Sequence, residues 1–300
     1  MNALIDGIKV PKQLLGTLNE TDLNNSSDTD LRNNLEQDGY LFLRNVINYK
    51  NILKARNHIF KKLNEVNELE DPFVEGIASG KSTRDEMHKD RGLFWESLSN
   101  TTSLRQVTNG SNLENVFTKI FGAPSVGFDF IFLRAVASGK FTHMHCDAGF
   151  FTRKTQSVLT CWLVFTDISL DKGPLFIIEG SHKLKEIQNK YKNFDVDLHK
   201  DLKATIETHP VKFAKERNTR ILTAEFKPGD ALIFGMYTVH GTFENHATDK
   251  KIRLTCDIRF QPENEPKDPR YFGHSPGGTT GAGYAELNSA RPLNEDWHIR

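Results

Sequence analysis

The stretch of sequence that decides the fold is residues 226–241, FKPGDALIFGMYTVHG. Phe226 ends one apolar run, the Pro228-Gly229 pair forms a tight turn, and residues 231–234 form a second apolar run. A third run covers residues 238–245. Short apolar runs that are separated by turn signals predict neighbouring β-strands.

The same pattern continues on both sides of this stretch, from about residue 127 to about residue 261. Apolar residues at helical spacing predict helices near residues 30–37, 49–67 and 112–121, and residues 40–46 suit a strand. Helices first and many strands afterwards predict a mostly β fold with flanking helices, a β-sandwich or jelly roll with the helices packed on one sheet. The candidate strands are residues 127–137, 141–148, 158–168, 174–179, 223–226, 231–234, 238–245 and 252–260.

We expect a single large domain at residues 28–260, because a chain of 300 residues can bury about 75% of its unfolded-state surface. Residues 1–27 are rich in Asn, Asp, Ser and Thr and are predicted to be a flexible lead-in. Residues 261–300 form a Pro- and Gly-rich tail that packs on the core or on a partner subunit. Between residues 70 and 100 the pattern breaks up, which indicates a solvated loop or, alternatively, a lid over an active site.

The composition argues against several classes of function. Lys plus Arg and Asp plus Glu both number 39, and this balance argues against nucleic acid as a partner. The longest apolar runs fall far short of the roughly 20 residues that cross a bilayer, and the first residues lack the features of a secretory signal. Three cysteines without a close pair suit free buried thiols in a reducing compartment. We therefore expect a cytoplasmic protein that binds neither nucleic acid nor membrane.

The segment with the most chemical information is residues 141–147, FTHMHCD. If it is a strand, residues 143, 145 and 147 share one face, because side chains alternate along a strand. An imidazole and a carboxylate two residues apart can bind one metal ion, and a distant histidine completes the set. With His240 as third ligand, His145 and Asp147 make the 2-His-1-carboxylate arrangement of iron(II) oxygenases. A lone His-x-Asp is common by chance, and His240 by itself is typical of a buried core histidine.

Residues 252–260, IRLTCDIRF, show a second informative pattern. Polar residues at 253, 255, 257 and 259 alternate with apolar ones, which predicts one wet face and one face packed against protein. Two arginines on the wet face suit an anionic ligand, because guanidinium groups bind carboxylates bidentately. The alternative is an ion-pair ladder on a surface edge strand.

Two further stretches complete a resemblance to a known family. Residues 37–47, QDGYLFLRNVI, and residues 171–183, DKGPLFIIEGSHK, occur in the expected order with the segments above. Over most of residues 30–260 the chain resembles the phytanoyl-CoA dioxygenase family of iron and 2-oxoglutarate oxygenases, and the implied core is a cupin-like double-stranded β-helix. By this resemblance His182 has a structural or supporting role and is not a metal ligand.

The resemblance implies that the catalytic metal ligands, for Fe(II), are His145, Asp147 and His240. Family members often carry Gln where this chain has Cys146, and by alternation that side chain turns away from the metal. His143 shares the face of the ligands, and its role is either at the pocket rim or in ordinary packing.

The resemblance also implies a site for 2-oxoglutarate. Arg253, with Thr242 or Thr255, is expected to hold the far carboxylate of this cosubstrate. Trp162, on the strand that follows the first two ligands, is expected to line the cosubstrate pocket.

The implied activity is oxidation of an unactivated C–H bond of a small organic molecule by O2, coupled to decarboxylation of 2-oxoglutarate to succinate and CO2. The outcome is hydroxylation, desaturation or cyclisation, because the carboxylate ligand Asp147 leaves no place for the halide of the related halogenases. We expect a monomer or homodimer acting on an anionic or zwitterionic substrate, with charged residues at the mouth: Arg84, Arg91, Arg153 and Lys154. The alternatives are a cupin-type metal-binding isomerase or hydrolase and a non-catalytic ligand-binding jelly roll.

Overall fold

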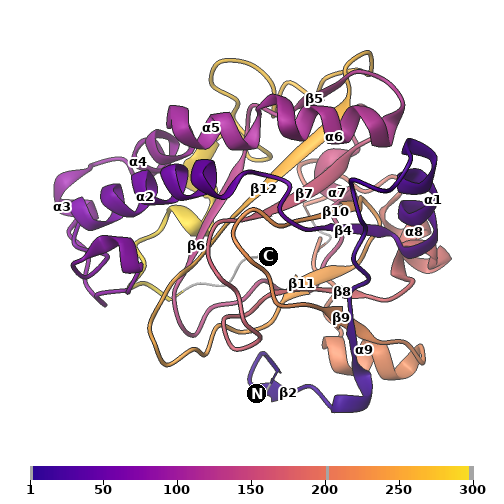
Figure 1. The fold of residues 1–300 in the computed structure, drawn as a ribbon, viewed down its shortest axis with the longest axis horizontal. Coiled ribbons are helices and arrows are strands. Elements are labelled where there is room, and N and C mark those ends of the chain that lie inside the picture. Colours follow the sequence, from indigo (N-terminus) through magenta and orange to yellow (C-terminus); the bar gives the residue numbers. More distant parts are fainter. Residues whose placement is uncertain (1–2, 201–202, 297–300) are drawn as a thin grey trace.

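The computed structural model describes residues 3–200 and 203–296 and arranges them in three layers. A group of helices covers one face of a six-stranded sheet, and a four-stranded sheet lies against the other face (Figure 1). Two facing sheets with helices on one side form the jelly roll that the order of elements predicted. No helix in the described part of the chain is long and apolar enough to cross a membrane.

The two sheets are built mainly from antiparallel strands. The larger has the order β4 (Tyr40–Leu43), β10 (Ala231–Gly235), β7 (Leu159–Val164), β12 (Arg253–Pro262) and β5 (Ser125–Gly127), and β6 (Phe132–Val136) also pairs with β12. The smaller has the order β11 (His240–Thr242), β8 (Leu175–Ile178), β9 (Ile221–Thr223) and β3 (Leu15–Thr17). A separate pair consists of β1 (Leu4–Ile5) and β2 (Ile8–Lys9).

The helices begin and end where local signals place them. In α1, the side chain of Ser27 accepts a hydrogen bond from the backbone of Asp30 in a capping box, and Gly39 ends the helix with φ 81°. The helices are α1 (Asp28–Asp38), α2 (Tyr49–Glu65), α3 (Arg84–Met87), α4 (Arg91–Ser99), α5 (Thr102–Thr108), α6 (Ser111–Phe121), α7 (Ala148–Phe151), α8 (Lys185–Tyr191) and α9 (Pro210–Glu216).

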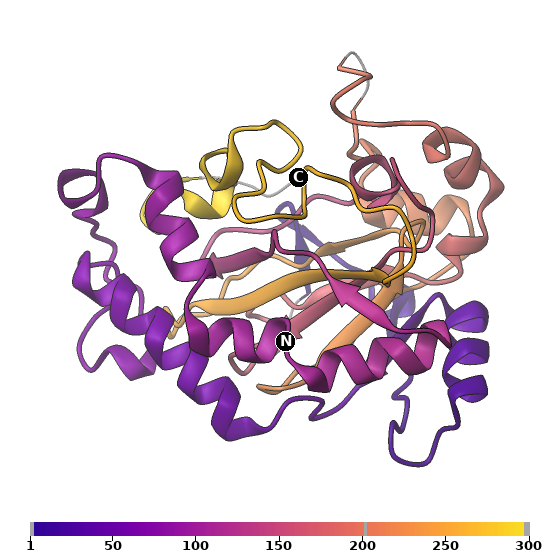
Figure 2. The ribbon, with the colours of Figure 1, turned by 90° about the horizontal axis from the view of Figure 1, so that it is seen from above.

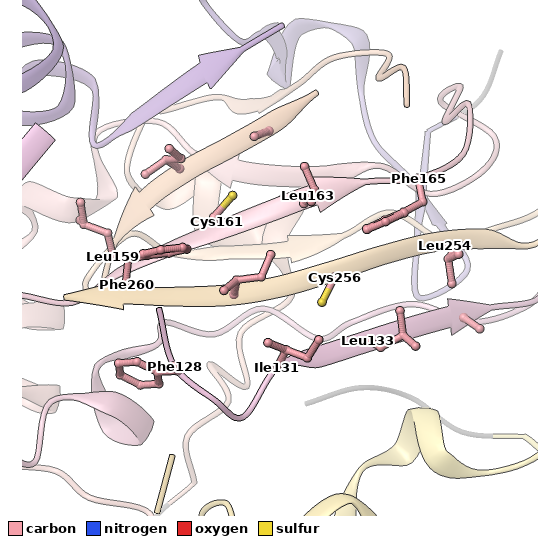
Figure 3. Close-up of a cluster of buried hydrophobic side chains, with 14 of the residues drawn as sticks. Phe128, Ile131, Leu133, Leu159, Cys161, Leu163, Phe165, Leu254, Cys256 and Phe260 are labelled. Atoms are coloured by element: carbon pink, nitrogen blue, oxygen red, sulfur yellow. The ribbon is translucent and has the colours of Figure 1, made fainter. Parts of the chain in front are cut away.

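The two faces of the larger sheet have different partners. On the face toward the helices, alternate residues of β6, β7 and β12 form a cluster that includes Leu133, Cys161, Leu163, Leu254 and Cys256 (Figure 3). The other face contributes to a second, smaller apolar cluster between the sheets. The polar residues of β12 therefore point between the two sheets, as predicted, and the alternative of an ion-pair ladder on a surface edge strand does not hold because β12 is a central strand.

The predicted flexible lead-in at residues 1–27 is wrong for its described part, residues 3–27. Strand β3 pairs in parallel with β9, and Val10 and Leu18 are buried. A short strand that adds to an existing sheet gains its hydrogen bonds from the partner strand, so its own composition carries little signal.

The predicted solvated loop at residues 70–100 is also wrong over much of its length. It contains α3 and α4, and Arg84 and Trp95 are fully buried. The charged run suggested an exposed segment, but Arg84 in this run is buried because it forms an ion pair with Glu68.

The tail packs on the core through its described residues, up to Asp296. Tyr284 stacks on Phe130 with ring centroids 4.4 Å apart, and the 3-10 helix Gly283–Glu286 lies beside α4. In Figure 2 this yellow segment lies next to the purple helices at one end of the sheet.

Candidate metal centre

The two histidines of the predicted set meet through their backbones. The N–H of His145 donates to the carbonyl of His240 at 2.9 Å, and the N–H of His240 donates to the carbonyl of His145 at 2.9 Å. This reciprocal pair forms an isolated β-bridge at the start of β11 and brings the ring centroids within 4.3 Å. The segments that carry His145 and His240 can lie this close because residue 241 is glycine. A Cβ added at residue 241 would lie 2.9 Å from Phe176 and 3.0 Å from the carbonyl oxygen of Thr142.

Asp147 reaches the same point from the residue before α7. Its Oδ1 lies 3.6 Å from Nε2 of His145 and 4.0 Å from Nε2 of His240. One ligand atom from each of the three residues lies within 4.8 Å of the others, and all three residues are buried. Two imidazole nitrogens and one carboxylate oxygen on one side of a point form a facial set for a divalent metal.

Backbone carbonyls orient both imidazoles. Nδ1 of His145 lies 2.7 Å from the carbonyl oxygen of His143, and Nδ1 of His240 lies 3.0 Å from that of Thr238. A carbonyl oxygen only accepts hydrogen bonds, so Nδ1 carries the proton in each ring and Nε2 keeps its lone pair for a metal. Burial and the neighbouring His145 lower the pKa of His240 to about 4, so this imidazole is neutral at neutral pH.

Asp147 is oriented through its second oxygen. Oδ2 accepts hydrogen bonds from Thr160 Oγ1 at 2.5 Å and from Arg259 Nη2 at 2.9 Å, which leaves Oδ1 facing the imidazoles. Burial by itself would raise the pKa of Asp147, but Arg259 and the two histidines outweigh it and hold the pKa well below its usual value. The carboxylate is therefore ionised, as a metal ligand must be.

The backbone of the first two candidate ligands differs from the predicted one. Residues 141–148 were predicted to be a strand, whereas Asp147 has φ −82° and ψ −11° and leads into α7. Strand alternation therefore does not explain why His145 and Asp147 meet. Cys146 is nevertheless fully buried in the apolar core, away from the metal ligands, as expected.

Thr160 and Arg259 were not singled out for this contact. Both side chains point inward by alternation, but only the tertiary structure places them on Asp147.

Residues 171–183, part of the family resemblance, contact the segment that carries His240. Oγ of Ser181 accepts the backbone N–H of Val239, the residue before His240, at 2.9 Å. His182 is not at the metal centre: its Nε2 lies 3.1 Å from the carbonyl oxygen of Glu36 at the end of α1. A structural role for His182 agrees with this position.

Arg253 and Thr255 lie deeper between the sheets. Arg253 is fully buried and donates from Nη1 to the carbonyl oxygen of Gly173, while its Nε and Nη2 have no partner among the described residues. Thr255 Oγ1, two residues along the same strand face, is likewise buried without a partner in the described part. Burial and the neighbouring Arg134 lower the pKa of Arg253 to about 9, and Asp257 opposes the shift only in part. These unpaired donors fit a carboxylate that the polypeptide itself does not supply.

The other two predicted cosubstrate residues have partners within the protein. Thr242 lies two residues after His240, and its Oγ1 accepts the backbone N–H of Thr142 at 2.8 Å. Trp162 lies opposite Asp257 in the pairing of β7 with β12 and packs edge-on against Phe226. Both face the space between the sheets.

A cavity of about 520 Å³ opens over the metal centre, with His145 and Asp147 in its wall. The charged residues predicted to border the mouth, Arg84, Arg91, Arg153 and Lys154, do not line this cavity. The three arginines form ion pairs instead: Arg84 with Glu68, Arg91 with Asp85 and Glu295, and Arg153 with Asp195 and Asp197. Loop charges gave no signal for the cavity, because its lining comes from the sheet and the tail.

A jelly roll with a facial 2-His-1-carboxylate set defines the class of non-haem iron oxygenases. A family model described as phytanoyl-CoA dioxygenase (PhyH) matches residues 35–253. The chain belongs to the phytanoyl-CoA dioxygenase family, which confirms the resemblance and, with it, iron and 2-oxoglutarate as cofactors. No curated protein sequence matches the chain significantly.

Solved structures share the fold at low sequence identity. The carbocyclase SnoK from nogalamycin biosynthesis, described as non-heme and alpha ketoglutarate dependent, is 15% identical, with a TM-score of 0.56 over 93% of this chain and 98% of that chain. The epimerase SnoN, solved with Fe3+, alpha ketoglutarate and nogalamycin RO, is 15% identical, with a TM-score of 0.55 over 83% and 92%. EctD from S. alaskensis, in its apoform, is 14% identical, with a TM-score of 0.54 over 88% and 85%. These likenesses confirm the predicted double-stranded β-helix fold.

Proposed function

We propose that this protein is an Fe(II)- and 2-oxoglutarate-dependent dioxygenase that oxidises an unactivated C–H bond of a small organic molecule. The observation that carries the proposal is the convergence of His145, Asp147 and His240, which are all buried, with Asp147 ionised and His240 neutral as metal ligands must be. When bound, iron with 2-oxoglutarate supplies activation of O2, and the cosubstrate leaves as succinate and CO2.

The chain's own residues bind and orient. Nε2 of His145, Nε2 of His240 and Oδ1 of Asp147 hold the metal from one side, and the cavity leaves the other side open for cosubstrate, O2 and substrate. Arg253 and Thr255 offer their unpaired donors to the far carboxylate of 2-oxoglutarate, with Thr242 and Trp162 in the same inter-sheet space. The tail, between Gly278 and Arg291, forms one side of the cavity.

Asp147 also narrows the outcome, because it fills the position that a halogenase leaves to halide. Hydroxylation, desaturation and cyclisation all start from removal of the same substrate hydrogen, and each stays within the proposal. The cupin-type isomerase or hydrolase does not need a buried guanidinium with free donors between the sheets, so Arg253 favours the oxygenase. We propose the cytoplasm as location, because Cys146, Cys161 and Cys256 are buried and free.

The proposal is tested by anaerobic titration of the metal-free protein with Fe(II) and 2-oxoglutarate. We expect the weak visible metal-to-ligand charge-transfer band of the ternary complex, and His145→Ala or Asp147→Ala should abolish it. Arg253→Ala should weaken 2-oxoglutarate binding roughly ten- to a hundredfold while iron affinity stays nearly unchanged, because a charge-assisted hydrogen bond is lost away from the metal.

His143→Ala is the matched control, since His143 is a histidine two residues from His145 and its backbone carbonyl, which the substitution keeps, contacts Nδ1 of His145. This variant should keep the band. A wild-type protein without the band, or a band that survives Asp147→Ala, would contradict the proposed function.

A further inference from the structure

We propose that the cavity over the metal centre takes a small organic acid, and that its carboxylate binds Arg134 while its apolar body lies among phenylalanine rings. This inference rests on the proposed function and names the substrate class for that site. Arg134 was not predicted to bind substrate. It follows a run of apolar residues in β6, and such a run indicates a buried strand and not a binding residue.

The walls of the cavity combine aromatic surface with guanidinium groups. Phe130, Phe132, Phe150 and Phe151 supply rings, and Arg134 and Arg259 supply cations, beside His145 and Asp147. A volume of about 520 Å³ falls within the range of small-molecule sites. The four rings form the apolar part of a wall that is otherwise polar, and this combination suits a molecule with an apolar body and one polar end.

The two guanidinium groups differ in what they can still bind. Arg259 donates to Asp147 and lies between the rings of Phe132 and Phe151, with its Cζ 4.6 and 4.2 Å from their centroids. Its Nε and Nη1 are covered and have no hydrogen-bond partner among the described residues. Arg259 therefore positions the metal ligand, and its guanidinium is held between the two rings.

Arg134 is open to the cavity. Its Nε donates to Asp257 Oδ2 at 2.5 Å, and its side chain keeps 13% of its surface exposed. Within the described part of the chain no hydrogen bond engages its two Nη atoms. A guanidinium that is anchored through Nε presents Nη1 and Nη2 as a fixed pair of donors, which suits a carboxylate.

Charge balance points to the same ligand class. Among the described residues on the inner face of β6 and β12 and at the metal ligands, three guanidinium groups meet two carboxylates. A divalent metal and a 2-oxoglutarate dianion cancel each other, so one positive charge remains in a buried space. Uncompensated buried charge is costly, and a monoanionic substrate removes that cost. The groups are Arg134, Arg253, Arg259, Asp147 and Asp257.

The far side of the cavity comes from the tail, between Gly278 and Arg291. This segment lies beyond residues 35–253, which match the family. Arg291 and Glu286 stand at its exposed rim, where solvent screens their charges.

The test uses the full-length protein loaded anaerobically with Fe(II) and 2-oxoglutarate. Benzoate, phenylacetate and cyclohexanecarboxylate are titrated against their primary amides, and binding is followed by the shift of the charge-transfer band. At least one acid should bind roughly tenfold or more tightly than its amide, because Arg134 makes a charge-assisted contact with the acid alone. Arg134→Gln should remove this preference, and Arg134→Lys should keep part of it.

Arg220→Gln is the matched control, since it removes an exposed arginine that does not line the cavity; it should change acid binding by less than about threefold. Each variant's own band shows that its metal site has folded. The proposal is overturned if no acid binds more tightly than its amide, or if Arg134→Gln weakens 2-oxoglutarate as much as the acid. A wild-type protein that gives no band overturns the proposed function itself, and this outcome is distinct from both.

Discussion

At the scale of single residues, the metal centre depends on side chains that never touch the metal. Asp147 has two equivalent oxygens, and which of them faces the imidazoles is decided by Thr160 and Arg259, which both donate to Oδ2. The histidine rings are oriented by backbone carbonyls. Such partners preorganise ligands, so their loss is felt in metal affinity before it is felt in folding.

Thr160→Val should therefore weaken Fe(II) binding roughly tenfold or more, with a small loss of stability, because only Arg259 then holds Oδ2 and the carboxylate is less firmly oriented. Metal affinity is measured by competition with a chelator, and stability by urea unfolding of the metal-free protein.

Thr223→Val is the control for the loss of a buried hydroxyl. Thr223 Oγ1 donates to the carbonyl oxygen of Leu175 at 2.7 Å, away from the metal ligands. This variant should lose about 1 kcal/mol of stability and keep its metal affinity. Equal metal affinities for the two variants would contradict the inference that Thr160 positions Asp147 for metal binding.

At the scale of elements, the sheet is held in shape by the helices on its outer face. Helix α4 is the least expected of them, because the charged residues before it suggest a loop. Trp95 of α4 is fully buried, and its Nε1 donates to the carbonyl oxygen of Leu133 in β6 at 3.2 Å. Helix α4 thus supports the strand that carries Arg134 on its opposite face.

Trp95→Ala should lower the free energy of unfolding by about 3–5 kcal/mol, because a large side chain leaves a cavity in the core. Leu93→Ala on the same helix removes a side chain that is 63% exposed and should change it by less than about 0.5 kcal/mol. Urea denaturation measures both. Similar losses for the two variants would mean that α4 does not pack as described.

At the level of the whole molecule, the buried side chain of Arg84 links the C-terminal tail to the N-terminal helices. Arg84 Nη2 donates to Glu68 Oε2 at 2.5 Å, and Arg84 Nη1 donates to the carbonyl oxygen of Ala290 at 2.6 Å. Burial raises the pKa of Glu68, although Arg84 opposes the shift. One side chain thus connects residues near α2, α3 and the segment that covers the cavity.

Arg84→Met should destabilise the protein by about 3–5 kcal/mol, because it leaves Glu68 buried without a counter-ion. The double variant Arg84→Met with Glu68→Leu should recover much of that loss in thermal or urea unfolding. Arg220→Met, which breaks the exposed pair with Glu179, should cost less than about 1 kcal/mol. If the double variant were no more stable than Arg84→Met alone, the unpaired charge would not be the cause.

The sequence by itself determined the local elements and the three candidate ligands. Helix α1 carries its own start at Ser27 and its own stop at Gly39, and α2 shows one apolar face, because helix signals lie within a few residues of each other. Strands with regular apolar alternation, such as β12, were found for the same reason. His145, Asp147 and His240 could be chosen because few residue types bind iron and their order matched a family.

Only the tertiary structure decided how these parts meet. Strand β3 forms its hydrogen bonds with β9, and Arg84 is buried because it forms an ion pair with Glu68. Asp147 is oriented by hydrogen bonds from Thr160 and Arg259. Each of these depends on residues far apart in the chain, and neither periodicity nor spacing reports a distance in space. The cavity shows this most clearly, because the sheet and the tail that enclose it meet only after the chain has folded.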